Sequence, residues 1–118
     1  MRLEIRRRGL KITEGLRTFL NERLRLALAH FGRHAEVVRV YLRDLNGPRG
    51  GPDKKCRVVV ELPPRGRVVV TGIDTDIRAA INVTANRAGV AVKRHVKRRR
   101  AHRRPPRRRV RGLPSLVA

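Results

Sequence analysis

Residues 75–100 read TDIRAAINVTANRAGVAVKRHVKRRR, and this stretch decides how the chain folds. Its apolar side chains recur every three or four residues and form one stripe, made of Ile77, Ile81, Ala85, Ala88 and Val92. Such a stripe is typical of a helix that packs one face against a protein core. The stripe stops beyond about Val96, and positive charge follows. We therefore predict a helix that starts at Asp74 or Thr75 and passes from a packed segment into a polycation.

The chain before this helix contains four runs with the pattern of strands. Residues 2–7 and 36–45 alternate apolar and charged side chains, which predicts strands with one buried face. The second of these strands would bury Val38, Val40 and Leu42 and expose Arg39, Tyr41 and Arg43. Two more β-rich runs, 55–62 and 67–72, are separated by the turn signal PPRG.

Between the first two strands the period becomes helical. Residues 11–34 place one apolar stripe at helical spacing, made of Leu16, Leu20, Leu24, Ala27 and Phe31. Thr13 fits the N-cap, and Gly32 fits the C-terminal stop. The order is thus β-α-β-β-β-α. One four-stranded sheet with two helices on one face is the simplest α+β architecture that buries all these apolar faces.

The charge of the chain indicates a polyanionic partner. The 118 residues include 31 Lys and Arg against 9 Asp and Glu, a net charge of +22. RNA, DNA and anionic membranes are the candidate partners. No segment approaches the roughly 18 apolar residues that span a bilayer, so we expect a cytoplasmic protein. We assign residues 1–98 to one folded domain and 99–118 to a basic tail, disordered without a partner because of Pro105, Pro106 and charge repulsion.

Few residues have the pattern of a catalytic or metal site, and we predict no enzyme, cofactor or small-molecule substrate. Asp74 and Asp76 stand where carboxylates stabilise the start of a helix, so we interpret them as capping residues. His30 and His34 lack a nearby third ligand for a metal. The single Cys56 lies in a strand pattern and is interpreted as a buried structural thiol.

Basic residues on the two helices are the candidate binding residues. On the second helix Arg87, Arg94 and Arg98 share a stripe opposite the apolar one, at about 100° per residue. The same segment contains Lys93 and Lys97. On the first helix the candidates are Arg17, Arg25 and Arg23, the last of which lies at the edge of the apolar stripe with its guanidinium expected in solvent.

Aromatic residues are too scarce for a stacking platform. Only Phe19, Phe31 and Tyr41 occur, and the two Phe fit the core face of the first helix. Recognition should therefore rest mainly on phosphate and shape. Tyr41 lies outward between Arg39 and Arg43, and we interpret it as a packing or edge residue in preference to a base-stacking one.

Two stretches resemble a known family. ITEGLRTFLNERLRLALAHFGR, residues 12–33, is similar to the first helix of the short ribosome hibernation-promoting factors, which include ribosome-associated inhibitor A, once labelled a sigma-54 modulation protein. DIRAAIN, residues 76–82, resembles the family signature Asp-Met-Tyr-Ala-Ala-Ile-Asp. The resemblance covers about residues 1–98.

This resemblance implies a topology like that of double-stranded-RNA-binding domains and a site on the 16S rRNA of the small ribosomal subunit. There the family occupies the decoding channel, blocks messenger and tRNA sites and preserves idle 70S ribosomes. The implied protein is a monomer when free. Arg23, Arg87 and Arg94 match positions that the family fills with Lys or Arg. Whether the protein also pairs ribosomes stays open.

The sequence departs from the family at several positions. Arg78 replaces the usual Tyr of the signature, Val90 and Leu26 replace frequent basic residues, and Gly89 weakens the second helix. These changes suggest that the binding surface has moved toward the Arg-rich end. The alternative function is that of a general RNA-binding or ribosome-assembly protein, and charge alone does not distinguish RNA from DNA.

Overall fold

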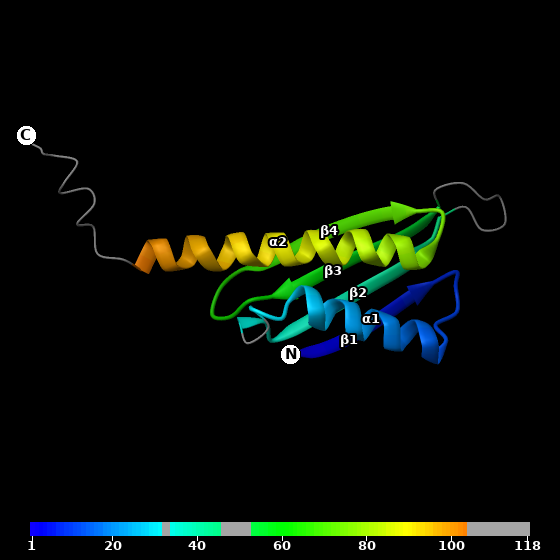
Figure 1. The fold of residues 1–118 in the computed structure, drawn as a ribbon, viewed down its shortest axis with the longest axis horizontal. Helices are drawn as coiled ribbons and strands as arrows, with labels where there is room; N and C mark the ends of the chain where they lie inside the picture. Colours follow the sequence, from blue (N-terminus) through cyan, green and yellow to red (C-terminus); the bar gives the residue numbers. More distant parts are fainter. Residues whose placement is uncertain (32–33, 46–52, 104–118) are drawn as a thin grey trace, which may run out of the picture.

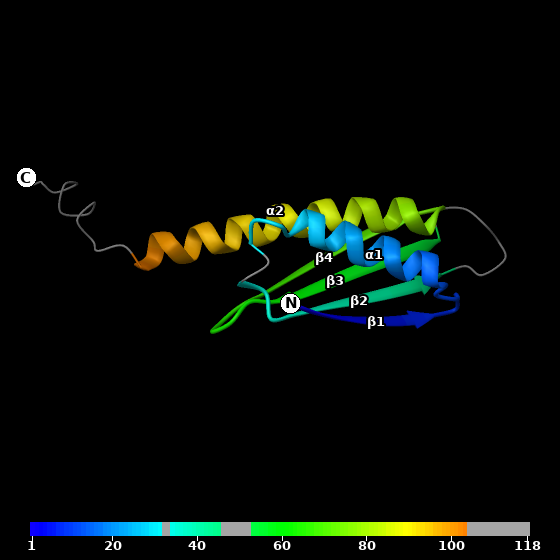
Figure 2. The same ribbon diagram turned by 60° about the horizontal axis from the view of Figure 1, so that its bottom comes forward.

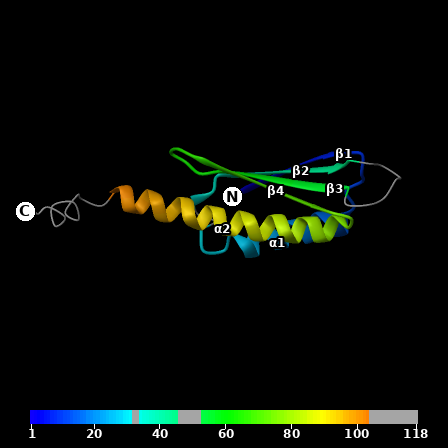
Figure 3. The ribbon, with the colours of Figure 1, turned by 90° about the horizontal axis from the view of Figure 1, so that it is seen from above.

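A four-stranded sheet carries two helices on one of its faces (Figures 1 and 3). The structure, a computed structural model, describes residues 1–31, 34–45 and 53–103. The elements are β1 (Arg2–Arg8), α1 (Glu14–Ala27), β2 (Val37–Asp44), β3 (Lys54–Glu61), β4 (Arg67–Asp74) and α2 (Ile77–Arg103). This order confirms the predicted β-α-β-β-β-α fold.

The strands lie in the order β1-β2-β3-β4 (Figure 2). β1 and β2 are parallel, whereas β2–β3 and β3–β4 are antiparallel. A parallel pair requires a crossover, and α1 supplies it. The predicted faces of β2 are confirmed, because Val38, Val40 and Leu42 are buried against the helices. The core between sheet and helices also contains the stripe of α1 (Leu16, Leu20, Leu24), the inner face of β3 (Cys56, Val58, Val60) and the stripe of α2 (Ile81, Ala85, Val92).

Side-chain caps start both helices. The Thr13 hydroxyl accepts a hydrogen bond from the Leu16 amide at 3.1 Å, as predicted. Before α2, the Asp74 carboxylate accepts from the Asp76 amide at 3.1 Å, and Asp76 accepts from the Arg78 amide at 3.4 Å. The hydrogen bond from the Asp76 amide lowers the pKa of Asp74. Both carboxylates therefore organise the start of a helix, in agreement with the capping interpretation.

The helix α1 ends earlier than its apolar stripe. It stops at Ala27 with Leu28 as C-cap, and the Ala29 amide then bonds the Leu26 carbonyl three residues back, which tightens the chain into a turn. Leu28 and Phe31 still pack on the core, so the stripe extended the predicted helix too far. His30 and His34 consequently lie outside the helix, and the predicted stop at Gly32 lies outside the described residues.

Two glycines let α2 approach its neighbours closely. A Cβ atom at Gly72 of β4 would lie 2.4 Å from the Thr84 Oγ1 of α2, and one at Gly89 of α2 would lie 2.7 Å from the Ala27 carbonyl oxygen of α1. Neither distance is compatible with a larger residue unless the elements move apart. Gly89, which the sequence marked as a weakness of the helix, is thus a point of close approach between α1 and α2.

The helix α2 continues to Arg103, beyond the boundary at residue 98 that composition suggested. Val96 is buried, and the Arg99 guanidinium donates to the Pro63 carbonyl of the β3–β4 turn at 3.0 Å. These contacts support a helical end that the charge pattern alone disfavours. Pro105 is the first residue that cannot continue a helix, and the residue before a proline also disfavours helical geometry. Residues 104–118 lie outside the described part of the chain. Nowhere in the described ranges is a helix both long and apolar enough to span a membrane.

We expect opposite effects of one substitution at two helical glycines. Gly15→Ala in α1 should raise the free energy of unfolding by about 0.5–1 kcal/mol, because Ala favours the helix and the new methyl would meet only ordinary contacts, the nearest at 3.7 Å. Gly89→Ala should lower it by about 1–3 kcal/mol, because the methyl would force α1 and α2 apart. Urea unfolding followed by circular dichroism measures both. A stabilising Gly89→Ala would contradict the close approach.

The buried thiol of Cys56 should make stability depend on pH in the alkaline range. Burial raises the pKa of Cys56 from 9.0 to about 11. Because the folded state disfavours the thiolate, the neutral thiol contributes its full stabilisation of the fold below pH 9. This stabilisation is lost as pH rises from 9 through 11. The free energy of unfolding should fall by an amount on the order of 2 kcal/mol relative to Cys56→Ala over this window. Parallel pH profiles of the two proteins, measured by urea unfolding under reducing conditions, would refute this expectation.

Candidate nucleic-acid interface

Arg23 joins the two helices. Its Nε donates to the Asn82 Oδ1 at 2.6 Å, and its Nη2 donates to the Asn86 Oδ1 at 2.9 Å. The guanidinium was expected in solvent, but residue Arg23 is half-buried and its guanidinium is anchored on α2 by two asparagines. Its Nη1 hydrogens have no partner among the described residues, so the fixed group can still donate to an anion.

A second contact joins the two helices at Arg78, where the resembled family has Tyr. The Arg78 guanidinium of α2 lies over the Phe19 ring of α1, 4.8 Å from its centroid. Such a cation–π contact stabilises the pair by roughly 0.5–1 kcal/mol at an exposed site. Arg78 stands where the resembled family has Tyr, and here it pairs with an aromatic ring. The sequence analysis missed this pairing because Phe19 was assigned wholly to the core.

Five cations of α2 form two rows on its outward surface. Arg87 and Arg94 line a hollow beside Val70 of β4, and Arg87 donates to the Thr71 carbonyl at 2.5 Å. Lys93 lines a groove with Ala27 and Phe31 on the α1 side. By helical spacing Arg98 continues the first row and Lys97 the second. All five side chains are exposed, and Val90, 50% exposed, lies between the rows.

The remaining two candidates lie apart from these rows. Arg17 and Arg25 are exposed on α1, but by helical geometry they lie more than about 100° around that helix from Arg23. They therefore face away from α2, and Arg25 donates to the Asn21 Oδ1 at 3.0 Å. The outward side of α1 presents Glu22 and Leu26, the latter 71% exposed. The structure thus gathers the α2 cations and Arg23 and leaves Arg17 and Arg25 on a separate flank.

The positive charge of α2 has no internal compensation. No Asp or Glu follows Asp76 in the sequence. Among the described residues, every ion pair joins cations and carboxylates of the sheet or its flanking loops, and none includes a helical cation. Oriented like charges without counter-charges create a positive potential that concentrates anions at the surface. No group of three or more His, Cys, Asp or Glu side chains is placed to hold a metal ion in this part of the chain.

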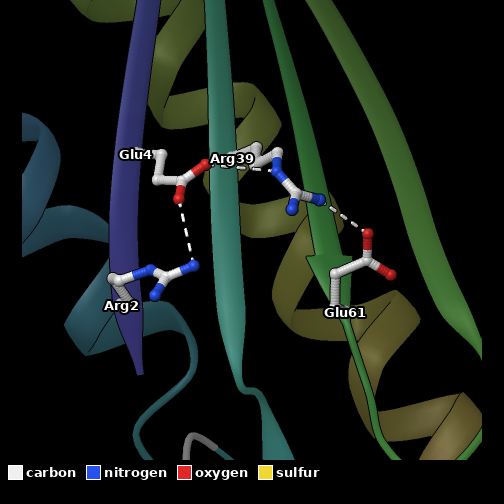
Figure 4. A network of polar contacts seen from close by, with 4 residues as sticks. All are labelled: Arg2, Glu4, Arg39 and Glu61. Atoms are coloured by element: carbon white, nitrogen blue, oxygen red, sulfur yellow. Dashed lines mark hydrogen bonds and ion pairs between the residues drawn. The ribbon is translucent and has the colours of Figure 1, made fainter.

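Carboxylates are instead used on the outer face of the sheet, away from the helices. Figure 4 shows Glu4 between Arg2 and Arg39, with both carboxylate–guanidinium distances at 3.2 Å, and Arg39 reaching Glu61 at 2.7 Å. The hydrogen bond that Arg39 donates to Glu61 raises the pKa of Arg39, and the one that Lys54 donates to Asp53 raises the pKa of Lys54. This network neutralises one end of the sheet's outer face.

The other end of that face holds a cation cluster that the sequence analysis did not single out. Its members line one hollow with Tyr41 and are Arg6, Arg8, Arg43, Lys55 and Arg57. The strand alternation placed each of them outward, but only the register of three strands brings them together.

Comparison with known proteins agrees with this geometry and with the resemblance of the two quoted stretches. The family described as sigma 54 modulation protein / S30EA ribosomal protein matches residues 3–100. The chain is similar to the N-terminal domain of Thermus thermophilus Protein Y, with 27% identity and a TM-score of 0.66 over 80% of this chain and 99% of that one. A ribosomal subunit interface protein from Coxiella burnetii shares the fold, with 11% identity and a TM-score of 0.71 over 82% of this chain and 99% of that one.

No curated protein gives a significant match to the chain. The family match, however, extends over all six elements up to residue 100 of α2. Because it spans far more than half of the sequence, the chain belongs to the sigma 54 modulation protein / S30EA ribosomal protein family.

Proposed function

We propose that this protein inhibits translation by binding the 16S rRNA of the small ribosomal subunit at the decoding channel, where it blocks the messenger and tRNA sites. The observation that carries the proposal is the exposed pair of cation rows on a helix without acidic residues, in a chain of this family. The related solved proteins are a Protein Y domain and a ribosomal subunit interface protein, which supports a ribosomal partner.

The contact would be made mainly by α2. Arg87, Arg94 and Arg98 form one row of phosphate donors, and Lys93 and Lys97 form a second. Arg87 is oriented by its bond to the Thr71 carbonyl, and Arg23 by its two asparagines, so both bind with less loss of side-chain freedom. Arg17 and Arg25 would reach a separate stretch of rRNA on the far flank of α1.

The mechanism is competition for space and involves no chemical step. A rigid domain seated in the channel excludes messenger and tRNA as long as it remains bound, so affinity and residence time determine inhibition. We place the protein in the cytoplasm as a free monomer that binds idle 70S ribosomes. It needs no cofactor in this role.

Reversal of two α2 charges should strongly weaken binding to the small subunit. Arg87→Glu/Arg94→Glu should weaken binding to small subunits about a hundredfold or more, since each lost charged contact is worth about 1.5–3 kcal/mol and repulsion adds to the loss. Co-sedimentation with small subunits, with and without messenger and initiator tRNA, measures this. The matched control is Lys11→Glu/Arg65→Glu, which makes the same charge change at exposed positions off both helices.

Wild-type protein should lose binding when messenger and tRNA are present, and the control pair should bind within about threefold of wild type. Binding that ignores tRNA, or falls equally in both variants, would refute occupation of the decoding channel and leave a general RNA-binding protein. Repeating the sedimentation with 70S ribosomes shows whether paired ribosomes form.

Salt should weaken the complex steeply, and residues 104–118 should contribute a separate part of this salt dependence. The five cations of the two α2 rows alone predict a slope of log affinity against log salt of roughly −4, and the five arginines of residues 104–118 roughly double it. The full chain should then lose about 10³- to 10⁵-fold in affinity between about 50 and 200 mM salt. Truncation after Arg103 should halve the slope, as measured by binding titrations. An unchanged slope would mean that residues 104–118 do not touch the rRNA.

A further inference from the structure

The outer face of the sheet holds a second surface suited to RNA. The strand register aligns Arg6, Tyr41 and Arg57 across β1, β2 and β3 in one rung, and Arg8, Arg43 and Lys55 in the next rung of that face. Neighbouring strands lie about 4.8 Å apart, so five cations surround one aromatic ring. The helices lie on the opposite face (Figure 3), so this cluster, the sheet cluster, is distinct from the α2 rows.

The sheet cluster has no counter-charges of its own. None of its five cations forms an ion pair with a residue in the described ranges, and the two acids of this face, Glu4 and Glu61, are engaged with Arg2 and Arg39 farther along the sheet. Like charges directly opposite each other on adjacent strands destabilise a sheet. A bound polyanion would remove this repulsion. The hollow among them, about 230 Å³, is below the roughly 300–1,000 Å³ of small-molecule sites.

Tyr41 favours nucleic acid over an acidic protein as the occupant. Its side chain is 37% exposed at the centre of the cluster, and the Arg57 guanidinium lies 5.7 Å from the ring centroid. An aromatic ring set among phosphate-binding cations is the arrangement on which unpaired bases stack. The exposed part of the ring leaves room for a base, in addition to the packing or edge role that the sequence suggests. We propose that the sheet cluster binds a single-stranded RNA segment, with phosphates on its cations and one base on Tyr41.

The composition of the chain provides a local probe for this site. Tyr41 is its only tyrosine and it has no tryptophan, so tyrosine emission reports on Tyr41 alone. An oligouridylate of about 12 nucleotides should quench this emission saturably at about 150 mM salt in the full-length protein. Arg8→Glu/Arg43→Glu should shift the quenching midpoint at least about tenfold, because two phosphate contacts become repulsive. Both residues are exposed, and a circular dichroism melt checks that the variant folds.

Two controls separate this site from the others. Arg65→Glu, in the turn at the opposite end of the same sheet, and Arg87→Glu/Arg94→Glu on α2 should leave the quenching midpoint within about threefold. Because the α2 variant should bind small subunits only weakly, unchanged quenching in this variant would separate RNA binding at the sheet cluster from the proposed ribosomal function. Saturating RNA without quenching, equal shifts in the sheet and control variants, or equal quenching by an oligoglutamate of the same charge would each overturn the proposal.

Discussion

The seating of α2 is the constraint on which the rest of the structure depends. The helix is held at two points where a glycine allows close approach, against β4 at Gly72 and against α1 at Gly89. These contacts fix its distance from the sheet and its rotation about its own axis. Rotation determines which residues point outward, so the same two glycines that let the core close also direct Arg87, Arg94 and Lys93 to the surface. A helix that moved outward by the width of a methyl group would still be basic, but its two rows would no longer be fixed relative to β4 and α1.

Such a helix must reconcile packing with repulsion. A net charge of +22 opposes a compact state, and α2 has no carboxylate with which to offset it. The chain keeps the helix folded by apolar contacts up to Val96 and by the bond from Arg99 to the Pro63 carbonyl, neither of which requires a carboxylate. The repulsion that remains is relieved when a polyanion binds. Stability and binding are therefore linked, and the free protein is less stable than the bound one.

Local patterns predicted the parts of the structure that depend on local physics. The Thr13 cap, the Asp74–Asp76 start of α2, the burial of Cys56 and the element order all follow from periodicity and capping chemistry. What could not be predicted depends on contacts between elements. Arg23 needed the facing asparagines of α2, Arg78 needed Phe19, and the sheet cluster needed the register of three strands. The apolar stripe of α1 also overstated the helix, because a side chain can reach the core from a turn as well as from a helix.

The distribution of acids separates structural cations from binding cations better than the cations themselves do. Where an arginine serves the fold, a carboxylate is fixed beside it, as Glu4 and Glu61 are for Arg39. Where no carboxylate partner exists among the described residues, as on α2 and at the sheet cluster, the positive charge has no fixed counter-charge. Under the two proposals, phosphates of RNA would supply counter-charges at both surfaces. The domain would then be held from two sides, and two individually weak contacts with one RNA assembly would give a long residence time without either being tight. Long residence is what an inhibitor that acts only by occupying space requires.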